Sequence, residues 1–136
     1  LDVSIQAGIL QLLKTIQQEM GLTIMFISHD LSVVANFCDD VAVMYLGKIV
    51  ELAPTKKLFT DPKHPYTKAL FQSIPSIHPD TQTTLQTLEG EIPSIYQKPQ
   101  GCVFQTRCPI VSSRCKVDQP SMKKHNEHQT ACFYST

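Results

Sequence analysis

The apolar positions at the start of the chain change their period near residue 21. Up to residue 16 they recur at steps of three and four, at Ile5, Ile9, Leu12, Leu13 and Ile16. This spacing predicts a helix that begins near Val3, buries one apolar face in a core and ends at Gly21. The next run, 22–28, is apolar and partly β-branched, which predicts a strand buried on both faces of a parallel sheet.

A histidine and an acid follow this predicted strand directly. Ligands of open α/β sheets bind beyond the carboxyl ends of the strands, so His29 lies where a catalytic group is expected. A histidine that only begins a loop is the alternative. Asp30 is placed to cap a second helix, whose buried side is predicted to comprise Leu31, Val33, Val34 and Phe37. A helix followed by a strand is the repeating unit of a doubly wound sheet, so the predicted fold class is α/β.

A hairpin is predicted after the second helix. Two β-prone runs, 41–46 and 49–51, flank Gly47-Lys48, which is typical of a hairpin with its turn at those two residues. Cys38, at the end of the preceding helix, is expected to be a small buried apolar residue.

Prolines change the character of the chain after the hairpin. All nine lie at position 54 or later, and they bound two short predicted helices, 54–59 and 66–71. His64 is expected to be a surface turn residue, because no metal-ligand partner lies near it in the sequence. The Thr- and Gln-rich stretch 77–87 is predicted to be a linker.

The overall composition excludes some cellular settings and binding partners but does not identify a function. The chain has 136 residues with 12 basic and 12 acidic side chains, so no net charge argues for binding to nucleic acid or to an anionic membrane surface. No apolar run approaches the roughly 20 residues that span a bilayer, and no signal peptide precedes the first helix. The chain begins without a methionine, and we interpret it as a fragment of a larger protein.

Four cysteines gather in the last third of the chain. Cys102, Cys108, Cys115 and Cys132 are separated by five, six and sixteen residues. Disulfides are typical of oxidising compartments, and structural zinc usually shows two closely spaced pairs of ligands, which this spacing lacks. An iron–sulfur cluster takes four thiolates from surrounding loops, and the irregular spacing suits such a site. The residues by themselves leave these three alternatives open.

Several segments resemble the ATP-binding-cassette (ABC) ATPases. The text TIMFISHDL at 23–31 is similar to the switch-histidine segment of that family, and 1–6 resembles the end of the D-loop that precedes it. The text VMYLGKIVE at 43–51 is also very similar to family text. HPYTKAL at 64–70 resembles the peptide-importer branch. The tail from residue 91, with G-C-x-F-x-x-R-C-P and a final His-x-x-x-Cys, resembles the C-terminal domain of oligopeptide and dipeptide importer ATPases.

This resemblance implies roles for particular residues. His29 would contact the γ-phosphate of ATP and align the attacking water, and Asp2 would lie at the seam between two ATP-binding domains. Some members of the branch bind a 4Fe–4S cluster, which assigns that role, with zinc as the alternative metal, to Cys102, Cys108, Cys115 and Cys132. Cys38 has no ligand role. Arg107 either faces the charge of the cluster, pairs with an acid or is solvated, and these alternatives stay open.

The resemblance also implies a fold and its division. Residues 1–53 would be the C-terminal part of an ABC-type P-loop NTPase domain, 54–90 short helices and a linker, and 91–136 a small irregular Cys-rich domain. The phosphate-binding loop, the signature motif and the acidic strand that holds magnesium are absent from the sequence. Because that loop supplies most of the affinity for ATP, the 136 residues alone are expected not to hydrolyse ATP.

The function that the resemblance implies is ATP-driven import of oligopeptides or dipeptides across the bacterial cytoplasmic membrane. The full-length protein would use ATP and Mg²⁺ at the cytoplasmic face of the membrane of a bacterium or archaeon. Its partners would be a second ATPase subunit, two membrane permease subunits and a substrate-binding protein, without nucleic acid. The alternative is a stand-alone metal-binding or interaction module that retains ATPase remnants, and the gene sequence upstream would distinguish the two.

Overall fold

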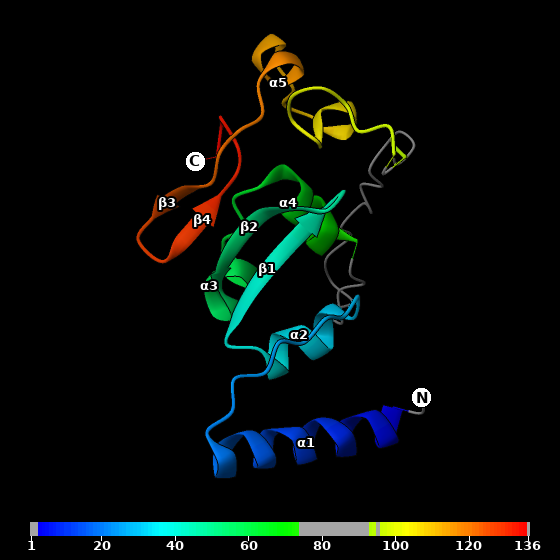
Figure 1. The fold of residues 1–136 in the computed structure, drawn as a ribbon, viewed down its shortest axis with the longest axis vertical. Helices are drawn as coiled ribbons and strands as arrows, with labels where there is room; N and C mark the ends of the chain where they lie inside the picture. The colour runs from blue at the N-terminus through cyan, green and yellow to red at the C-terminus, as the bar shows by residue number, and fades with distance from the viewer. Residues whose placement is uncertain (1–2, 74–92, 95, 136) are drawn as a thin grey trace, which may run out of the picture. The chain divides into compact units, whose positions relative to one another are not determined.

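Helices and an antiparallel sheet make up the computed structural model (Figure 1), which describes residues 3–73, 93–94 and 96–135. The chain divides into an N-terminal unit, residues 1–39, and a C-terminal unit, residues 40–136. The mixture of helix and sheet agrees with the predicted α/β class at this coarse level. Within the described ranges, no helix has both the length and the apolar character needed to cross a membrane.

The first helix ends where the sequence predicts, but its apolar face is exposed. Helix α1 spans Val3–Met20, and Gly21 follows with a φ of +63°, which glycine adopts without strain. The side chains along the apolar face stay largely accessible, with 54, 45 and 59% exposure at Ile5, Ile9 and Leu12. The prediction that this face is core is wrong for the described residues, because they supply too little apolar surface to cover it.

The segment after Gly21 is not a strand. Residues 22–28 are extended without ladder pairing, and Met25 and Ile27 are both 88% exposed. The prediction of a strand buried on both faces is therefore wrong here. A strand of a parallel sheet forms only when neighbouring strands pair its backbone N–H and C=O groups. Residues 3–39 contain no strand that could do so.

Asp30 caps helix α2, as predicted. Helix α2 spans Leu31–Phe37, and the Asp30 carboxylate accepts hydrogen bonds from two backbone N–H groups of its first turn, at 2.9 and 3.3 Å. Val34 is buried, and the other predicted inner residues are half-buried. The ring of Phe37 meets Phe26 edge to face, with centroids 5.3 Å apart. The cap prediction is confirmed, and the burial is less complete than predicted.

The C-terminal unit is built on a four-stranded antiparallel sheet. In spatial order its strands are β1 (Asp40–Tyr45), β2 (Lys48–Pro54), β4 (His128–Thr130) and β3 (Lys123–His125). Strands β1 and β2 form the predicted hairpin, but the turn residues are Leu46 and Gly47, one position earlier than expected. Both have a positive φ, 45° and 74°, which the tight hairpin turn requires. The pairing of β2 with β4 joins the hairpin to the C-terminal tail (Figure 1).

Short helices lie between the strands. Helices α3 (Thr55–Thr60) and α4 (Pro65–Gln72) confirm the two helices predicted from the prolines. The 3-10 helix η1 (Gln105–Arg107) and helix α5 (Ser113–Val117) belong to the Cys-rich tail. The predicted linker 77–87 lies outside the described residues, and the domain boundaries near 53 and 90 stay a prediction.

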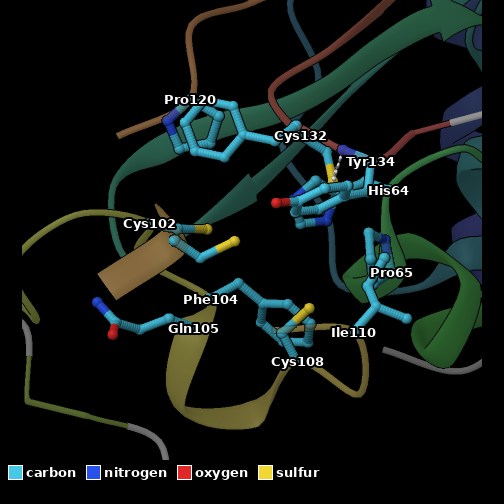
Figure 2. Close-up of a pocket in the computed structure, with 12 residues that line it drawn as sticks. His64, Pro65, Cys102, Phe104, Gln105, Cys108, Ile110, Pro120, Cys132 and Tyr134 are labelled. Carbon is cyan, nitrogen blue, oxygen red and sulfur yellow. Dashed lines mark hydrogen bonds between the residues drawn. The ribbon is translucent and has the colours of Figure 1, made fainter. Parts of the chain in front are cut away.

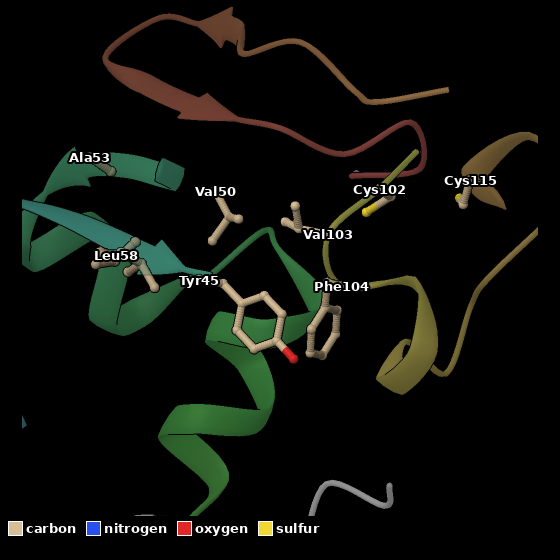
Figure 3. Packing of buried hydrophobic residues seen from close by; sticks show 9 residues of the cluster. Tyr45, Val50, Ala53, Leu58, Cys102, Val103, Phe104 and Cys115 are labelled. Carbon is tan, nitrogen blue, oxygen red and sulfur yellow. The ribbon is translucent and has the colours of Figure 1, made fainter. Parts of the chain in front are cut away.

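Three aromatic rings form the centre of the core of the C-terminal unit. The Tyr45 ring lies 4.8 Å from that of Tyr66 and 5.2 Å from that of Phe104, and the last two are 5.5 Å apart, centroid to centroid. The other buried members of this core are Val43, Val50, Ala53, Leu58, Cys102, Val103 and Cys115 (Figure 3). The β1–β2 hairpin and the cysteine-bearing segment therefore share one apolar core.

A buried carboxylate connects three parts of this unit. Glu51 of β2 is fully buried, and its oxygens accept hydrogen bonds from the backbone N–H groups of Lys63 and His64, at 2.6 and 3.0 Å. Oε1 also lies 2.6 Å from Nε2 of His128 in β4. A buried carboxylate is costly unless its oxygens are hydrogen-bonded. The contacts of Glu51 therefore fix the loop before α4 and strand β4 against β2.

We predict that Glu51→Gln destabilises the C-terminal unit by about 2 kcal/mol, because one acceptor oxygen becomes an NH₂ group that faces N–H donors. The measurement is urea unfolding followed by circular dichroism. Glu127→Gln is the matched control, because Glu127 is an exposed side chain that pairs with Lys57 at 2.9 Å, and exposed pairs contribute little. Equal stability of the two variants would show that the Glu51 contacts do not hold the unit together.

Candidate functional site

The four cysteines predicted as metal ligands surround one cavity. Cys102, Cys108, Cys115 and Cys132 all line one small cavity (Figure 2). The rest of the lining is largely apolar and includes Pro65, Phe104, Ile110, Pro120 and Phe133. The fold thus collects, in an apolar surrounding, four thiols that are dispersed over the last third of the sequence.

Gly101 allows two of these cysteines to approach closely. The N–H of Cys102 donates to the carbonyl oxygen of Cys115 at 2.8 Å. Gly101 has a φ of +80°, and a Cβ at this position would lie 2.5 Å from that same oxygen. Both the backbone angle and the lack of space exclude a side chain. Glycine is therefore required here for the Cys102 loop to meet the end of α5.

Backbone N–H groups point at the sulfur atoms. The N–H of Tyr134 donates to Sγ of Cys132 at 3.4 Å. The backbone N–H groups of Phe104 and Ile110 favour the charged forms of Cys102 and Cys108, although burial has the larger, opposite effect on the pKa of both thiols. The thiolate is the form that binds metals, so these amides are arranged as they would be around metal-bound sulfur.

Burial acts on the thiols in the opposite direction. It raises the pKa of Cys102 and of Cys108 above the usual value for a thiol, and the neighbouring cysteines of the cavity add to this increase. At neutral pH these two groups are therefore thiols while nothing positive is bound between them. A cation in the cavity would displace their protons, so binding would be weaker at low pH.

Thiolates are ligands of both zinc and iron–sulfur clusters. Among the described residues, no three His, Cys, Asp or Glu side chains form a group that could hold a metal ion. The arrangement of the four thiols therefore does not distinguish between these kinds of centre.

His64 is buried, which contradicts the expected surface position. Its side chain is 2% exposed, lines the cysteine cavity and caps α4, with Nδ1 accepting the N–H of Tyr66 at 3.1 Å. Burial lowers the pKa of His64 to about 4, although the Glu51 carboxylate opposes this shift. The sequence argument failed because it sought a metal-ligand partner nearby, whereas the contacts of His64 come from distant segments.

The predicted nucleotide-site residues lie in the other unit. His29 is exposed, at the end of the extended segment before α2, and Asp2 lies outside the described residues. Cys38 is half-buried at the end of α2 and is not part of the cysteine cavity. Arg107 is half-buried, so it is not a fully solvated arginine. Burial raises the pKa of Tyr66, and the positive charge of Arg107 opposes part of that increase.

Comparison with known proteins connects this architecture to a family. Residues 50–115 match the family model described as "Oligopeptide/dipeptide transporter, C-terminal region". This part of the chain is similar to the C-terminal region of oligopeptide/dipeptide transporter proteins. The matched segment begins in β2 and ends at the third cysteine of the cavity, and it includes Glu51 and His64.

Several transport ATP-binding proteins are similar to this chain over nearly its whole length. The oligopeptide transport ATP-binding protein OppF of Escherichia coli is 47% identical over 135 residues, which are 98% of this chain and 40% of the relative. The di/tripeptide transport ATP-binding protein DppF of Pseudomonas aeruginosa is 43% identical over 99% of this chain and 42% of the relative. The OppF of Salmonella typhimurium is 47% identical with the same coverage as the first. The chain spans about two fifths of the length of these relatives.

Sequence reasoning misses the two polar residues that organise the cavity. The hairpin pattern places Glu51 only at the end of a strand, although an acid between Val50 and Leu52 in an apolar run signals a buried contact. His64 precedes Pro65, and a proline at the first helical position marks the residue before it as the helix cap. The proline therefore indicates that His64 is a helix cap, but it does not indicate that the His64 side chain is buried.

We predict that Gly101→Ala destabilises the C-terminal unit by about 2 kcal/mol, because alanine must adopt a left-handed backbone angle against the Cys115 carbonyl. Thermal unfolding measures the effect. Gly8→Ala is the control, since Gly8 lies in α1 and a Cβ added there would meet no atom within 4 Å, and alanine favours the helix. A Gly101→Ala protein as stable as the parent would contradict the required close approach.

Proposed function

We propose that this chain is part of the ATP-binding subunit of a bacterial peptide importer, in which ATP hydrolysis drives oligopeptide or dipeptide uptake. The observation that carries the proposal is 43–47% identity, over 98% or more of the chain, to relatives named as oligopeptide and di/tripeptide transport ATP-binding proteins. The full-length protein binds ATP with Mg²⁺. Its partners are a second ATP-binding subunit, two permease subunits and a substrate-binding protein, and it lies at the cytoplasmic face of the membrane.

Within that subunit we assign His29 to the ATP site. Asp30 holds the start of α2 through its cap hydrogen bonds, so the backbone on one side of His29 is fixed while its ring stays exposed. An imidazole placed in this way can contact the terminal phosphate and orient the attacking water, which are positioning and electrostatic effects. Asp2 is assigned to the seam between the two ATP-binding subunits, by its place in the D-loop text.

We predict that His29→Ala in the full-length subunit lowers kcat for ATP hydrolysis about a hundredfold and leaves ATP affinity nearly unchanged. A transition-state contact of on the order of 3 kcal/mol gives this rate effect, while the phosphate-binding loop supplies the affinity. Phosphate release and nucleotide binding are measured separately on the assembled transporter. His125→Ala, at an exposed position of β3, is the control. Wild-type turnover in His29→Ala would remove His29 from the catalytic site.

For the cysteine cavity we propose a 4Fe–4S cluster held by Cys102, Cys108, Cys115 and Cys132. Two features support this assignment: the four thiols share one cavity, and the backbone N–H of Tyr134 donates to Sγ of Cys132. When bound, the cluster would supply one-electron chemistry or a structural cross-link. The protein residues would hold it, neutralise part of its charge through amides and exclude water with apolar side chains.

We predict that the 136-residue chain, purified without oxygen, is brown and binds roughly four irons per chain. Serine at any one of the four cavity cysteines should sharply reduce the iron content. Cys38→Ser should retain it, because Cys38 lies outside the cavity. Iron is measured by elemental analysis together with absorption spectra. An anaerobic preparation without iron, or an iron content that depends on Cys38, would overturn the cluster assignment.

A further inference from the structure

Strand β4 accompanies strand β2 over only part of its length. The last hydrogen bond between them runs from the backbone N–H of Ala131 to the carbonyl oxygen of Val50, at 2.8 Å. The chain then leaves the sheet, because Cys132 lines the cysteine cavity. In the described part of the chain, the first two residues of β2 therefore have no strand beside them on the side of β4.

A groove of about 250 Å³ lies at this place. Its walls include residues 48–50 of β2 and residues 119–122, which lead into β3, and Ala131 lines it where β4 ends. Because β3 pairs with the other side of β4, the groove lies where β4 would continue if it were longer. Its volume is slightly below that of the smallest usual ligand pockets, roughly 300 Å³, so it suits a short segment of chain.

The groove has a buried apolar part and an exposed rim. Val50 and Val103, which are 2 and 7% exposed, line its buried part (Figure 3). Ile49 and Met122 belong to the rim and are 44 and 37% exposed. In an extended peptide, alternate side chains point to opposite faces. A peptide strand in the groove could therefore cover the two valines with one side chain and direct the next toward solvent.

The charges at one end of the groove are positive. Lys48 lies at the end away from Ala131. Nζ of Lys98 lies 3.5 Å from the position that a Cβ on Gly47 would take, next to Lys48 in the sequence. None of the described side chains that line the groove is acidic, and the ion pairs of the described residues include neither lysine. Two ammonium groups at one end of the groove favour a carboxylate there.

From this geometry we propose that the groove binds the C-terminal residues of a short peptide, which joins the sheet as a strand beside β2. The peptide runs antiparallel to β2, in the direction of β4, because antiparallel pairs are the more stable kind. Its chain therefore ends near Lys48, where the ammonium groups of Lys48 and Lys98 contact the terminal carboxylate. Its backbone bonds to the unpaired edge of β2, and an apolar side chain covers Val50 and Val103.

The experiment measures the binding of a peptide to the 136-residue chain by fluorescence anisotropy. The probe is Gly-Ser-Gly-Ala-Val-Leu with fluorescein at its N-terminus and a free C-terminal carboxylate. The same peptide with a C-terminal amide should bind about tenfold more weakly, because it loses the charge-assisted contacts with the two lysines. Added salt should weaken binding of the acid more than that of the amide, since the lysines are exposed.

Two matched variants and a spectrum of the parent test the location of the peptide. Lys48→Glu should weaken binding of the acid by about tenfold or more, because it replaces attraction by repulsion. Lys56→Glu makes the same change of charge at an exposed position of α3 outside the groove and should bind as the parent does. In nuclear magnetic resonance spectra of the ¹⁵N-labelled parent, the peptide should shift the amide signals of Ile49 and Ala131, but not that of Asn126 in the turn between β3 and β4.

Several results would overturn the proposal: no binding of the acid up to about 1 mM, equal affinity for acid and amide, equal weakening by Lys48→Glu and Lys56→Glu, or signal shifts only outside the groove. If circular dichroism shows that Lys48→Glu does not fold, the acid–amide comparison and the signal shifts in the parent decide. The measurements use neither ATP nor iron, so their outcome is independent of the transport function and of the cluster assignment.

Discussion

The hydrogen-bonded carboxylate of Glu51 is the constraint on which the C-terminal unit depends. It lies in the strand β2, which has neighbours on both sides, and it is fully buried. Its partners come from the loop before α4 and from β4, segments separated by more than 60 residues of sequence. A buried carboxylate is tolerated only when its oxygens accept hydrogen bonds. The loop before α4 and strand β4 must therefore contact β2 in the folded unit.

The position of the cysteine cavity follows from this constraint. Holding the backbone of His64 places its ring against Phe104 and starts α4 at Pro65. Holding His128 fixes β4, and Cys132 follows that strand by two residues. Two walls of the cavity are therefore connected to one carboxylate, while Gly101 brings the Cys102 loop against Cys115. The same contacts therefore hold both the sheet and the cysteine cavity in place.

In the N-terminal unit, unlike the C-terminal unit, the described apolar side chains are not buried by contacts between distant segments. Its sequence pattern is strongly apolar, and its helices and their limits form as that pattern predicts, yet Ile9 of α1 and Ile27 of the extended segment stay exposed. A helix can satisfy its own backbone hydrogen bonds, whereas a strand needs neighbours. This difference explains why α1 and α2 are present in residues 3–39 while the predicted strand is not.

The sequence alone determined what depends on neighbours in the chain: the extent of α1, the Asp30 cap, the hairpin, the proline-bounded helices and the family resemblance. These features rest on period, caps and turn residues, which act over a few positions. Only the tertiary structure decided that Glu51 and His64 are buried and that four irregularly spaced cysteines line one cavity. Burial of a polar group depends on hydrogen-bond partners from segments far away in the sequence, and a local sequence pattern does not show which distant segments will be in contact.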